Sequence, residues 1–351
     1  MHGGQSPERP VSTTLPAFGW HPSLAGIRGL AILLVLGFHM SLPLTLGGPV
    51  GVTVFFVLSG FLITSLLVHE AARTGRIDLR GFYVRRIRRL YPALLVAVFL
   101  VVVVAAAAGQ MGAVAADSAL SLTYVSNWAR AAGDGMGLWN HTWSLGIEEQ
   151  FYLVWPVGFI VLRRYAAPTS WRFIAVLLAL AVGSGLLRLA LLVGGASGDR
   201  VYFGSDTRAE ALLAGCVLAC LFARPGGVTV PRWIGPLSIA TLLGLALFDI
   251  GPALWPGATY SLVSVASCGL IAAAMQPGRQ WLGLSSAVMV WFGERSYSLY
   301  IWHVPVILTL GVAMAGAPPL LRFCVVGLVS LVLAAGSYEY VERPFRRSRS
   351  K

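Results

Sequence analysis

Apolar runs of membrane-spanning length recur along this sequence. About ten can be placed, each near the roughly 20 residues that an α-helix needs to cross a bilayer. They are 24–44, 50–69, 91–109, 145–164, 171–194, 207–223, 233–250, 258–275, 297–316 and 319–340. Helices suit a membrane because they satisfy their backbone hydrogen bonds internally. The sequence therefore predicts an all-α, polytopic integral membrane bundle of about ten transmembrane helices.

The low charge content supports this class. Charged residues make up 11% of the 351 residues and apolar residues 57%, whereas a soluble domain carries about 25% charged residues. Two stretches, 110–144 and 276–296, are ambiguous, because each holds a short apolar piece that would lie in the interface or re-enter the membrane. We expect no soluble domain of any size.

The basic residues predict an orientation. With the N-terminus in the cytoplasm, most of the 26 Lys and Arg residues fall on the cytoplasmic side, as the positive-inside rule requires. Topology then accounts for most of the net charge of +12. These charges are scattered over loops and do not form a groove interleaved with aromatic residues. We therefore expect the lipid bilayer as a partner and no nucleic acid.

Three segments are expected: a disordered cytoplasmic tail over 1–21, a transmembrane domain over 22–345, and a basic cytoplasmic tail over 346–351. The first segment is not interpreted as a signal peptide, because it is polar and contains proline. The apolar run that follows it is also longer than that of a signal peptide. Both termini are therefore expected in the cytoplasm.

All four cysteines fall within apolar runs, and we expect them to be small core residues. They are Cys216, Cys220, Cys268 and Cys324. Cys216 and Cys220 share a helix face, but no histidine or acidic residue lies beside them at ligand spacing. We expect neither a disulfide framework nor a metal site.

Arg28 and His39 are ionisable residues inside the first apolar run. Eleven steps of about 100° place them on one helix face, about 16 Å apart along the axis. Ionisable residues in hydrocarbon are tolerated mainly where they face a bundle interior or a wet cavity. The pair therefore indicates a polar track from the membrane edge towards its middle. The structural alternative is that Arg28 reaches the headgroups and His39 bonds to a neighbouring helix.

A basic cluster precedes the third run, within the segment 80–92. Its members are Arg85, Arg86, Arg88 and Arg89. One interpretation is a stop-transfer cluster that binds anionic lipid. The other is a cytoplasmic cradle for phosphate groups, because the guanidinium fork matches phosphate geometry.

The segment HTWSLGIEEQFY (141–152) begins the fourth run, at the outer end of that span. In a structural interpretation, Ser144 caps the helix with Glu148 one turn on, and Trp143 lies at the membrane interface. In a functional interpretation, Glu148 orients His39, balances a buried arginine or helps to bind an acceptor hydroxyl. Both interpretations are open on these residues alone.

Arg208 and His303 also have two interpretations each. Arg208 lies between Asp206 and Glu210 at the start of the sixth run, where the three form either a local ion-pair network or part of a site. His303 in the ninth run is either a core histidine bonded to a backbone carbonyl or tyrosine, or a site residue.

Six motifs occur in a fixed order along the chain. They are GVTVFFVLSGFLITSLL (51–67), GRIDLRGFYVRRIRRLYPALL (75–95), HTWSLGIEEQFYLVWP (141–156), DTRAEALLAG (206–215), FGERSYSLYIWHVP (292–305) and YEYVERPFRR (338–347). Together with Arg28 and His39, this set resembles the membrane-bound acyltransferase 3 family of bacterial O-acyltransferases from about residue 22 to 347. One departure is Thr53, where relatives usually carry an aspartate, and we assign that position no role.

The resemblance implies transfer of an acyl group, usually acetyl, from cytoplasmic acyl-CoA to a hydroxyl. The expected acceptor is a cell-surface polysaccharide, a glycolipid or another sugar-containing molecule, and no cofactor is implied beyond acyl-CoA as the donor substrate. The enzyme would lie in the cytoplasmic (inner or plasma) membrane of a bacterium. Two alternatives are an acyltransferase of a small macrolide-type sugar and a membrane transporter, although the paired broken spans typical of transporters are not visible.

The resemblance also implies residue roles. His39 matches the essential histidine of the family and is expected to be a general base or a transient acyl carrier. Both direct transfer and a relay through acyl-imidazole stay open. Arg28, nearer the cytoplasm, suits a phosphate or the pantetheine carbonyl of the donor.

The resemblance also implies roles for the remaining candidate residues. The family carries a similar Arg-rich segment, which favours the phosphate cradle for Arg85, Arg86, Arg88 and Arg89. Relatives keep an acid at the position of Glu148, which is therefore favoured over Glu149 as a catalytic candidate. Ser144, Arg208 and His303 complete the predicted substrate-binding residues.

Overall fold

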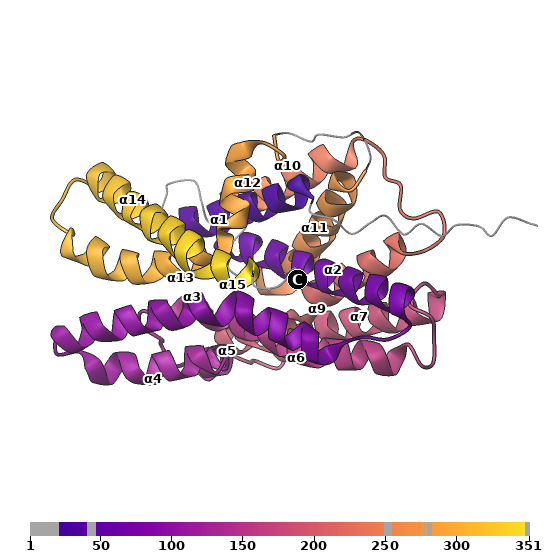
Figure 1. The fold of residues 1–351 in the computed structure, drawn as a ribbon, viewed down its shortest axis with the longest axis horizontal. Helices are drawn as coiled ribbons and strands as arrows, with labels where there is room; N and C mark the ends of the chain where they lie inside the picture. The colour runs from indigo at the N-terminus through magenta and orange to yellow at the C-terminus, as the bar shows by residue number, and fades with distance from the viewer. Residues whose placement is uncertain (1–20, 41–46, 249–254, 277, 279–282, 348–351) are drawn as a thin grey trace, which may run out of the picture.

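The computed structural model describes residues 21–40, 47–248, 255–276, 278 and 283–347, and within these residues it contains helices and no strand. The helices are α1 (Pro22–His39), α2 (Gly48–Thr74), α3 (Leu79–Ala107), α4 (Met111–Leu122), α5 (Ser126–Ala131), η1 (Asn140–Thr142), α6 (Trp143–Leu162), α7 (Trp171–Val193), α8 (Gly198–Phe203), α9 (Ser205–Phe222), α10 (Ile234–Leu247), η2 (Trp255–Thr259), α11 (Tyr260–Ala274), α12 (Ala287–Glu294), α13 (Ser296–Val306), η3 (Ile307–Gly311), α14 (Pro319–Ser337), η4 (Tyr338–Glu342) and α15 (Arg343–Arg347) (Figure 1). The all-α prediction is confirmed. The tails predicted at both ends lie almost wholly outside the described residues.

Seven helical segments in the described part of the chain are long and apolar enough to cross a membrane. They are Pro22–His39, Gly48–Thr74, Leu79–Ala107, Asn140–Leu162, Trp171–Val193, Gly257–Ala274 and Pro319–Arg346. Three other predicted spans fall on α9, α10 and α13. α10 has 14 residues and α13 has 11, and α9 carries three charged side chains in its first two turns. The count of ten spans is therefore not confirmed.

The helix boundaries differ most from the prediction at α3. It begins at Leu79, so the Arg-rich segment is part of the same helix as the third apolar run. Asp78 caps this start, because its carboxylate accepts a hydrogen bond of 2.9 Å from the backbone N–H of Gly81. The two ambiguous stretches also contain helices: α4, α5 and η1 lie within 110–144, and α12 lies within 276–296.

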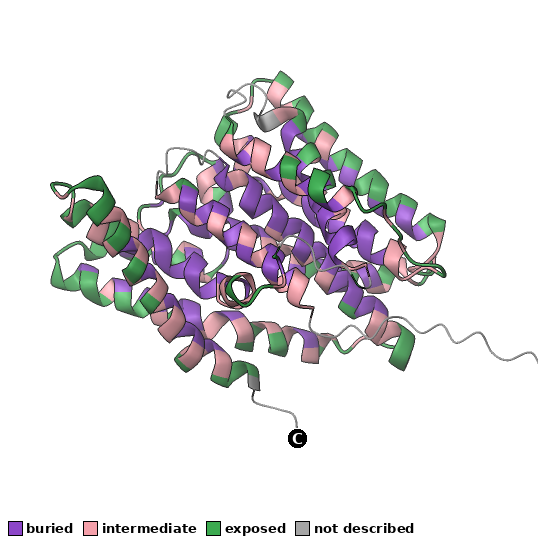
Figure 2. Cartoon of the chain, turned by 90° about the horizontal axis from the view of Figure 1, so that it is seen from above, coloured by how far each residue is buried: buried purple, intermediate pink, exposed green. Residues whose placement is uncertain are grey.

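α2 lies at the centre of the bundle, where it packs against α1, α9 and α11. Its contact with α9 is tight, because a Cβ on Gly60 would lie 1.8 Å from the Leu212 carbonyl oxygen, and one on Gly215 would lie 2.1 Å from the Val57 carbonyl oxygen. Small residues allow membrane helices to approach this closely. Glycines from both helices form the α1–α12 contact in the same way. Figure 2 shows the buried residues concentrated in the middle of the bundle.

Apolar side chains are exposed on the outer faces of several long helices. Examples are Phe99, Leu100, Val103 and Val104 on α3, Leu178, Leu180, Val182 and Leu186 on α7, and Leu320, Leu328 and Val332 on α14. Soluble monomers rarely expose apolar surface on this scale. These faces match lipid tails, so the chain is a multi-pass membrane protein.

The cysteines follow the prediction in part. Cys216 and Cys220 are buried in α9, and Cys268 in α11 is partly buried. The predicted core position is wrong for Cys324, which is exposed on α14. That helix packs along one side only, and Leu320 and Leu328 on it are exposed as well.

Candidate active site

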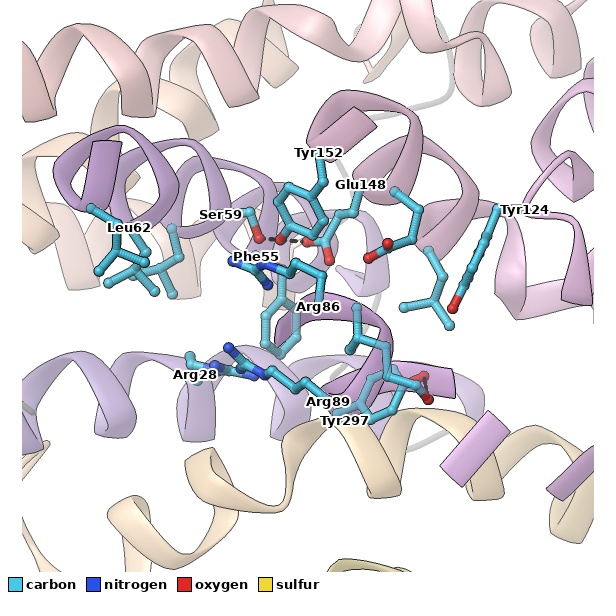
Figure 3. Close-up of a pocket in the computed structure, with 15 residues that line it drawn as sticks. Arg28, Phe55, Ser59, Leu62, Arg86, Arg89, Tyr124, Glu148, Tyr152 and Tyr297 are labelled. Carbon is cyan, nitrogen blue, oxygen red and sulfur yellow. Dashed lines mark hydrogen bonds between the residues drawn. The ribbon is translucent and has the colours of Figure 1, made fainter. Parts of the chain in front are cut away.

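A cavity of about 280 Å³ lies among α1, α2, α3, α6 and α13, with one wall from the turn after α4. Its polar lining residues are Arg28, Ser59, Arg86, Arg89, Tyr124, Glu148, Glu149, Tyr152 and Tyr297. Figure 3 shows Arg28 and Arg89 on one side of the cavity and Ser59, Tyr152 and Glu148 on the other, with the side chain of Arg86 between them. We call this space the arginine cavity.

The helical phase of α3 divides the predicted basic cluster into two pairs. Arg86 and Arg89 lie one turn apart and both line the arginine cavity. Arg86 also stacks on Tyr152, with 4.2 Å between its guanidinium carbon and the ring centre. Arg85 and Arg88 are exposed on the outer side of the helix. The structure therefore brings two of the four arginines to the cavity.

The charges in the arginine cavity are only partly compensated. Glu148 accepts a hydrogen bond of 2.8 Å from the Ser59 hydroxyl, and Arg28 donates one of 3.1 Å to the Ser296 hydroxyl. The Nε atom of Arg28 is buried without a partner. Within the described ranges, no ion pair joins the cavity arginines to Glu148 or Glu149. Guanidinium groups without a carboxylate partner in the described ranges suit a phosphate-bearing anion.

A second, smaller cavity of about 50 Å³ adjoins the first. The two share Arg28, Glu148 and Tyr297 among their lining residues. The smaller one extends to Ser144 and Tyr300, whose hydroxyl oxygens lie 2.7 Å apart. We call it the hydroxyl cavity. Together the two cavities form a path from the arginines to Tyr300.

Three histidines meet beyond Tyr300. The ring centre of His303 lies 4.9 Å from that of His39 and 5.0 Å from that of His141. Tyr300 touches this group, with its ring 5.3 Å from His141 and 5.5 Å from His303. The residues come from α1, η1 and α13, so the fold assembles a histidine cluster from three distant segments.

Hydrogen bonds fix the tautomer of two of these rings. Nδ1 of His39 lies 2.9 Å from the Val35 carbonyl oxygen. Nδ1 of His303 lies 2.8 Å from the backbone carbonyl oxygen of Tyr300. A carbonyl oxygen only accepts, so each Nδ1 carries the hydrogen and each Nε2 keeps a lone pair. His39 is therefore set up to act as a base or a nucleophile through Nε2. The core interpretation of His303 fits its backbone bond, whereas Nε2 is buried without a partner and the site interpretation stays a prediction.

The HTWSLGIEEQFY segment lies inside the bundle and not at its edge. His141 is 2% exposed and Trp143 6%, and the Trp143 ring contacts Phe56 of α2 at 6.2 Å between ring centres. The predicted interfacial position of Trp143 is therefore wrong. The capping interpretation is wrong as well, because Thr142 occupies the N-cap position and Ser144 bonds to Tyr300.

Arg208 lies away from both cavities. It donates a hydrogen bond of 2.8 Å to the Thr53 hydroxyl and lies 4.1 Å from the centre of the Tyr260 ring. Its neighbours on α9 pair elsewhere: Asp206 with Arg200 at 2.6 Å and Glu210 with Arg188 at 2.6 Å. The local acid–Arg–acid network is therefore not formed. The Thr53 hydroxyl accepts the hydrogen bond of Arg208 in place of a carboxylate.

Sequence analysis missed Ser59 and Tyr152 as lining residues of the arginine cavity. Tyr152 follows Glu148 by four residues on α6, so the two side chains share one helix face. This spacing is the signal that predicts Tyr152 as a lining residue. Ser59 carries no such signal, because only the contact between α2 and α6 brings it to Glu148.

Comparisons with known proteins agree with this kind of site. The chain matches the family described as an acyltransferase domain (acyltransferase 3) over residues 21–339. It is 36% identical over 349 residues to the putative peptidoglycan O-acetyltransferase YrhL of Bacillus subtilis, covering 93% of this chain and 55% of that protein. Identity to the peptidoglycan O-acetyltransferase OatA of Listeria monocytogenes is 33% over 355 residues, covering 93% and 56%. A putative O-acetyltransferase of Staphylococcus aureus is 34% identical over 362 residues, covering 94% and 58%.

The chain spans little more than half the length of these relatives. No solved structure matches it. The chain belongs to the acyltransferase 3 family. The predicted family is confirmed.

Proposed function

We propose that this enzyme moves an acetyl group from acyl-CoA in the cytoplasm to a hydroxyl of a cell-surface sugar polymer. Peptidoglycan is the favoured acceptor, because YrhL and OatA carry that acceptor in their names. The enzyme acts in the cytoplasmic membrane of a bacterium, with both termini in the cytoplasm. The observation that carries the proposal is the arginine cavity, which adjoins a path to the histidine cluster.

The arginine cavity suits the anionic part of the donor. CoA carries a diphosphate and a 3′-phosphate, and Arg28, Arg86 and Arg89 supply guanidinium forks for such groups. The volume of about 280 Å³ lies just below the range of about 300–1,000 Å³ for small-molecule sites. The cavity therefore holds part of CoA, and we place the diphosphate and the start of the pantetheine arm there.

The hydroxyl cavity continues in the direction that the thioester must take. It ends at Ser144 and Tyr300, and Tyr300 contacts the rings of His141 and His303. An extended pantetheine arm that follows this path brings its thioester to the histidine cluster. There, His39 acts through its Nε2 as the base for direct transfer or as the transient acyl carrier.

The acceptor is proposed to approach from the other end of α1. His39 is the last residue of that helix, about 16 Å along the axis from Arg28. It is partly exposed, and its neighbour Phe38 is 40% exposed. Donor and acceptor thus reach the histidine cluster from opposite sides, which suits a reaction between a cytoplasmic thioester and an extracytoplasmic sugar.

The proposal is tested with purified enzyme in lipid nanodiscs, acetyl-CoA labelled in the acetyl group, and soluble peptidoglycan fragments. We expect acceptor-dependent release of CoA and a labelled acetyl ester on the sugar, detected by mass spectrometry. A parallel reaction offers a macrolide as acceptor. Acetylation of the macrolide alone would contradict the proposed acceptor, and no CoA release with either acceptor would contradict the donor.

A further inference from the structure

Ser296 is the first residue of α13 and lines the hydroxyl cavity. It is only 1% exposed. Its Oγ accepts a hydrogen bond of 3.1 Å from the Arg28 guanidinium, and a guanidinium only donates. The hydroxyl hydrogen of Ser296 is therefore not used in that bond. Within the described residues, no oxygen accepts this hydrogen.

The other hydroxyl groups that line the hydroxyl cavity have given their hydrogens to protein oxygens. The Tyr297 hydroxyl donates a hydrogen bond of 2.7 Å to a backbone carbonyl oxygen, and the Tyr300 hydroxyl donates one of 2.6 Å to another. The Tyr300 hydroxyl has only one hydrogen, so in its 2.7 Å contact with Ser144 it accepts and Ser144 donates. In the described part of the chain, Ser296 is thus the only hydroxyl of this cavity with a hydrogen left for a ligand.

The walls of the cavity indicate what kind of ligand would accept this hydrogen. Val52, Phe55 and Leu145 supply apolar wall, and the volume of about 50 Å³ admits only a narrow chain. Buried polar groups are usually bonded, so the free donor calls for an acceptor on the ligand. A thin chain with apolar segments and a hydrogen-bond acceptor meets both conditions.

Ser296 lies between the two ends of the proposed donor path. Its bond to Arg28 places it beside the arginine cavity, which is assigned to the diphosphate. His303 follows seven residues later on the same helix, about 10 Å farther along its axis, and its ring contacts that of His39. The thioester is assigned to that far end. The group that faces Ser296 therefore belongs to the middle of the pantetheine arm, where two amides alternate with methylene groups.

We propose that the Ser296 hydroxyl donates a hydrogen bond to an amide carbonyl oxygen of the pantetheine arm, an inference that rests on the proposed function. Arg28 donates to the same hydroxyl, and this bond polarises it and makes it a stronger donor. A ligand without the carbonyl would leave the buried hydroxyl unbonded, and such a site rejects it for that reason. Ser296 thus selects pantetheine thioesters over thioesters of simpler thiols.

The first test measures the binding of acetyl-CoA to the wild type and to Ser296→Ala in nanodiscs by calorimetry. We expect the dissociation constant to rise about threefold to tenfold, as the loss of one hydrogen bond implies. The matched control is Ser267→Ala on α11, which removes a hydroxyl that is also 1% exposed but lines neither cavity. The control should leave the dissociation constant unchanged. Equal affinity in the wild type and Ser296→Ala would overturn the inference.

Two donor analogues separate a direct contact from an effect through Arg28. In each analogue, a trans alkene replaces one of the two pantetheine amides, which keeps the shape and removes the carbonyl. One analogue should bind the wild type more weakly than acetyl-CoA does, and Ser296→Ala should weaken its binding no further. If Ser296→Ala weakened acetyl-CoA and both analogues equally, the serine would act only by holding Arg28, and the proposed contact would be overturned.

A second variant keeps the test decisive if Ser296→Ala does not insert. Ser296→Cys keeps a side chain of similar shape with only a weak donor, and we expect the same loss for acetyl-CoA without a loss for that analogue. A wild-type enzyme that does not bind acetyl-CoA would instead refute the proposed function, so the two failures are distinguishable.

Discussion

Arg28 and His39 share one helix but belong to different parts of the site. Their spacing predicts a common face, and α1 presents both inward: Arg28 lines the two cavities, and His39 joins the histidine cluster. The polar track predicted from the sequence is thus continued by side chains of other helices. The sequence singles out His303 as a candidate but does not place it beside His39, because His141 and His303 come from η1 and α13 and reach α1 through tertiary packing.

Arg208 offers a test at the scale of one residue. It is 2% exposed, and no carboxylate in the described part of the chain lies within ion-pair distance of it. Thr53 donates its hydrogen to the Pro49 carbonyl oxygen and accepts from Arg208. Thr53→Asp would supply a carboxylate to a buried guanidinium that lacks one.

We expect Thr53→Asp to melt at a higher temperature than the isosteric Thr53→Asn. A hydrogen bond to a charged group contributes about 1.5–3 kcal/mol, and the comparison with asparagine isolates that charge. Thermal unfolding of the two purified variants in the same detergent measures the difference. Equal melting temperatures would mean that the carboxylate charge adds no stability and that the Tyr260 ring already stabilises the Arg208 guanidinium.

α3 supports a prediction that compares two faces of one helix. Replacing Arg86 and Arg89 with glutamine should raise the KM for acetyl-CoA, because each lost charge-assisted contact is worth about 1.5–3 kcal/mol. Replacing Arg85 and Arg88 on the exposed face should leave that KM unchanged. Steady-state kinetics of the two double variants checks this. A similar change in both would favour a general role in lipid binding over a donor site.

The contact between α2 and α9 allows a packing test. A Cβ on Gly215 would lie 2.1 Å from the Val57 carbonyl oxygen, whereas one on Gly183 of α7 would meet no atom within 4 Å. Gly215→Ala should destabilise the fold by about 1–3 kcal/mol, as overpacking does. Gly183→Ala should be neutral or slightly stabilising, because alanine favours helix. Unfolding curves that coincide for the two variants would contradict the observed helix contact.

The long elements follow from the sequence better than the short ones. A run of apolar residues is enough to predict α2, α3, α7 and α14, because length and hydropathy alone decide that a segment spans lipid. α6 shows the limit. Its predicted start lies at a membrane edge, whereas the structure begins it beside Phe56, in the interior of the bundle. The reason is that α4, α5 and η1 fold back before it, in a stretch without a clear period.

At the scale of the whole molecule, two side-chain bonds gather the basic loops at one end of the bundle. Arg163 after α6 donates a hydrogen bond of 2.6 Å to the Gly75 carbonyl oxygen after α2. Arg224 after α9 donates one of 2.6 Å to the Thr169 carbonyl oxygen before α7. The ends of four helices therefore lie on the same side. The positive-inside rule assigns that side to the cytoplasm.

This arrangement predicts the outcome of a topology experiment. Reporters fused after residues 78 and 228 should lie in the cytoplasm, and those after 47 and 255 should lie outside. Paired activity and fluorescence reporters measure both sides in intact cells. A reversed pattern at two or more sites would contradict a donor that enters from the cytoplasm.

The most direct test of the whole account is the transfer of a labelled acetyl group by wild-type enzyme and by His39→Ala in nanodiscs. Removing a base or nucleophile lowers the rate by at least about 10²–10⁴-fold, so we expect His39→Ala to insert normally and to release almost no CoA in the presence of acceptor. In the wild type without acceptor, a hydroxylamine-sensitive label on the protein would indicate the acyl-imidazole relay, and no label would indicate direct transfer. Near-normal transfer by correctly inserted His39→Ala would contradict the central role of His39.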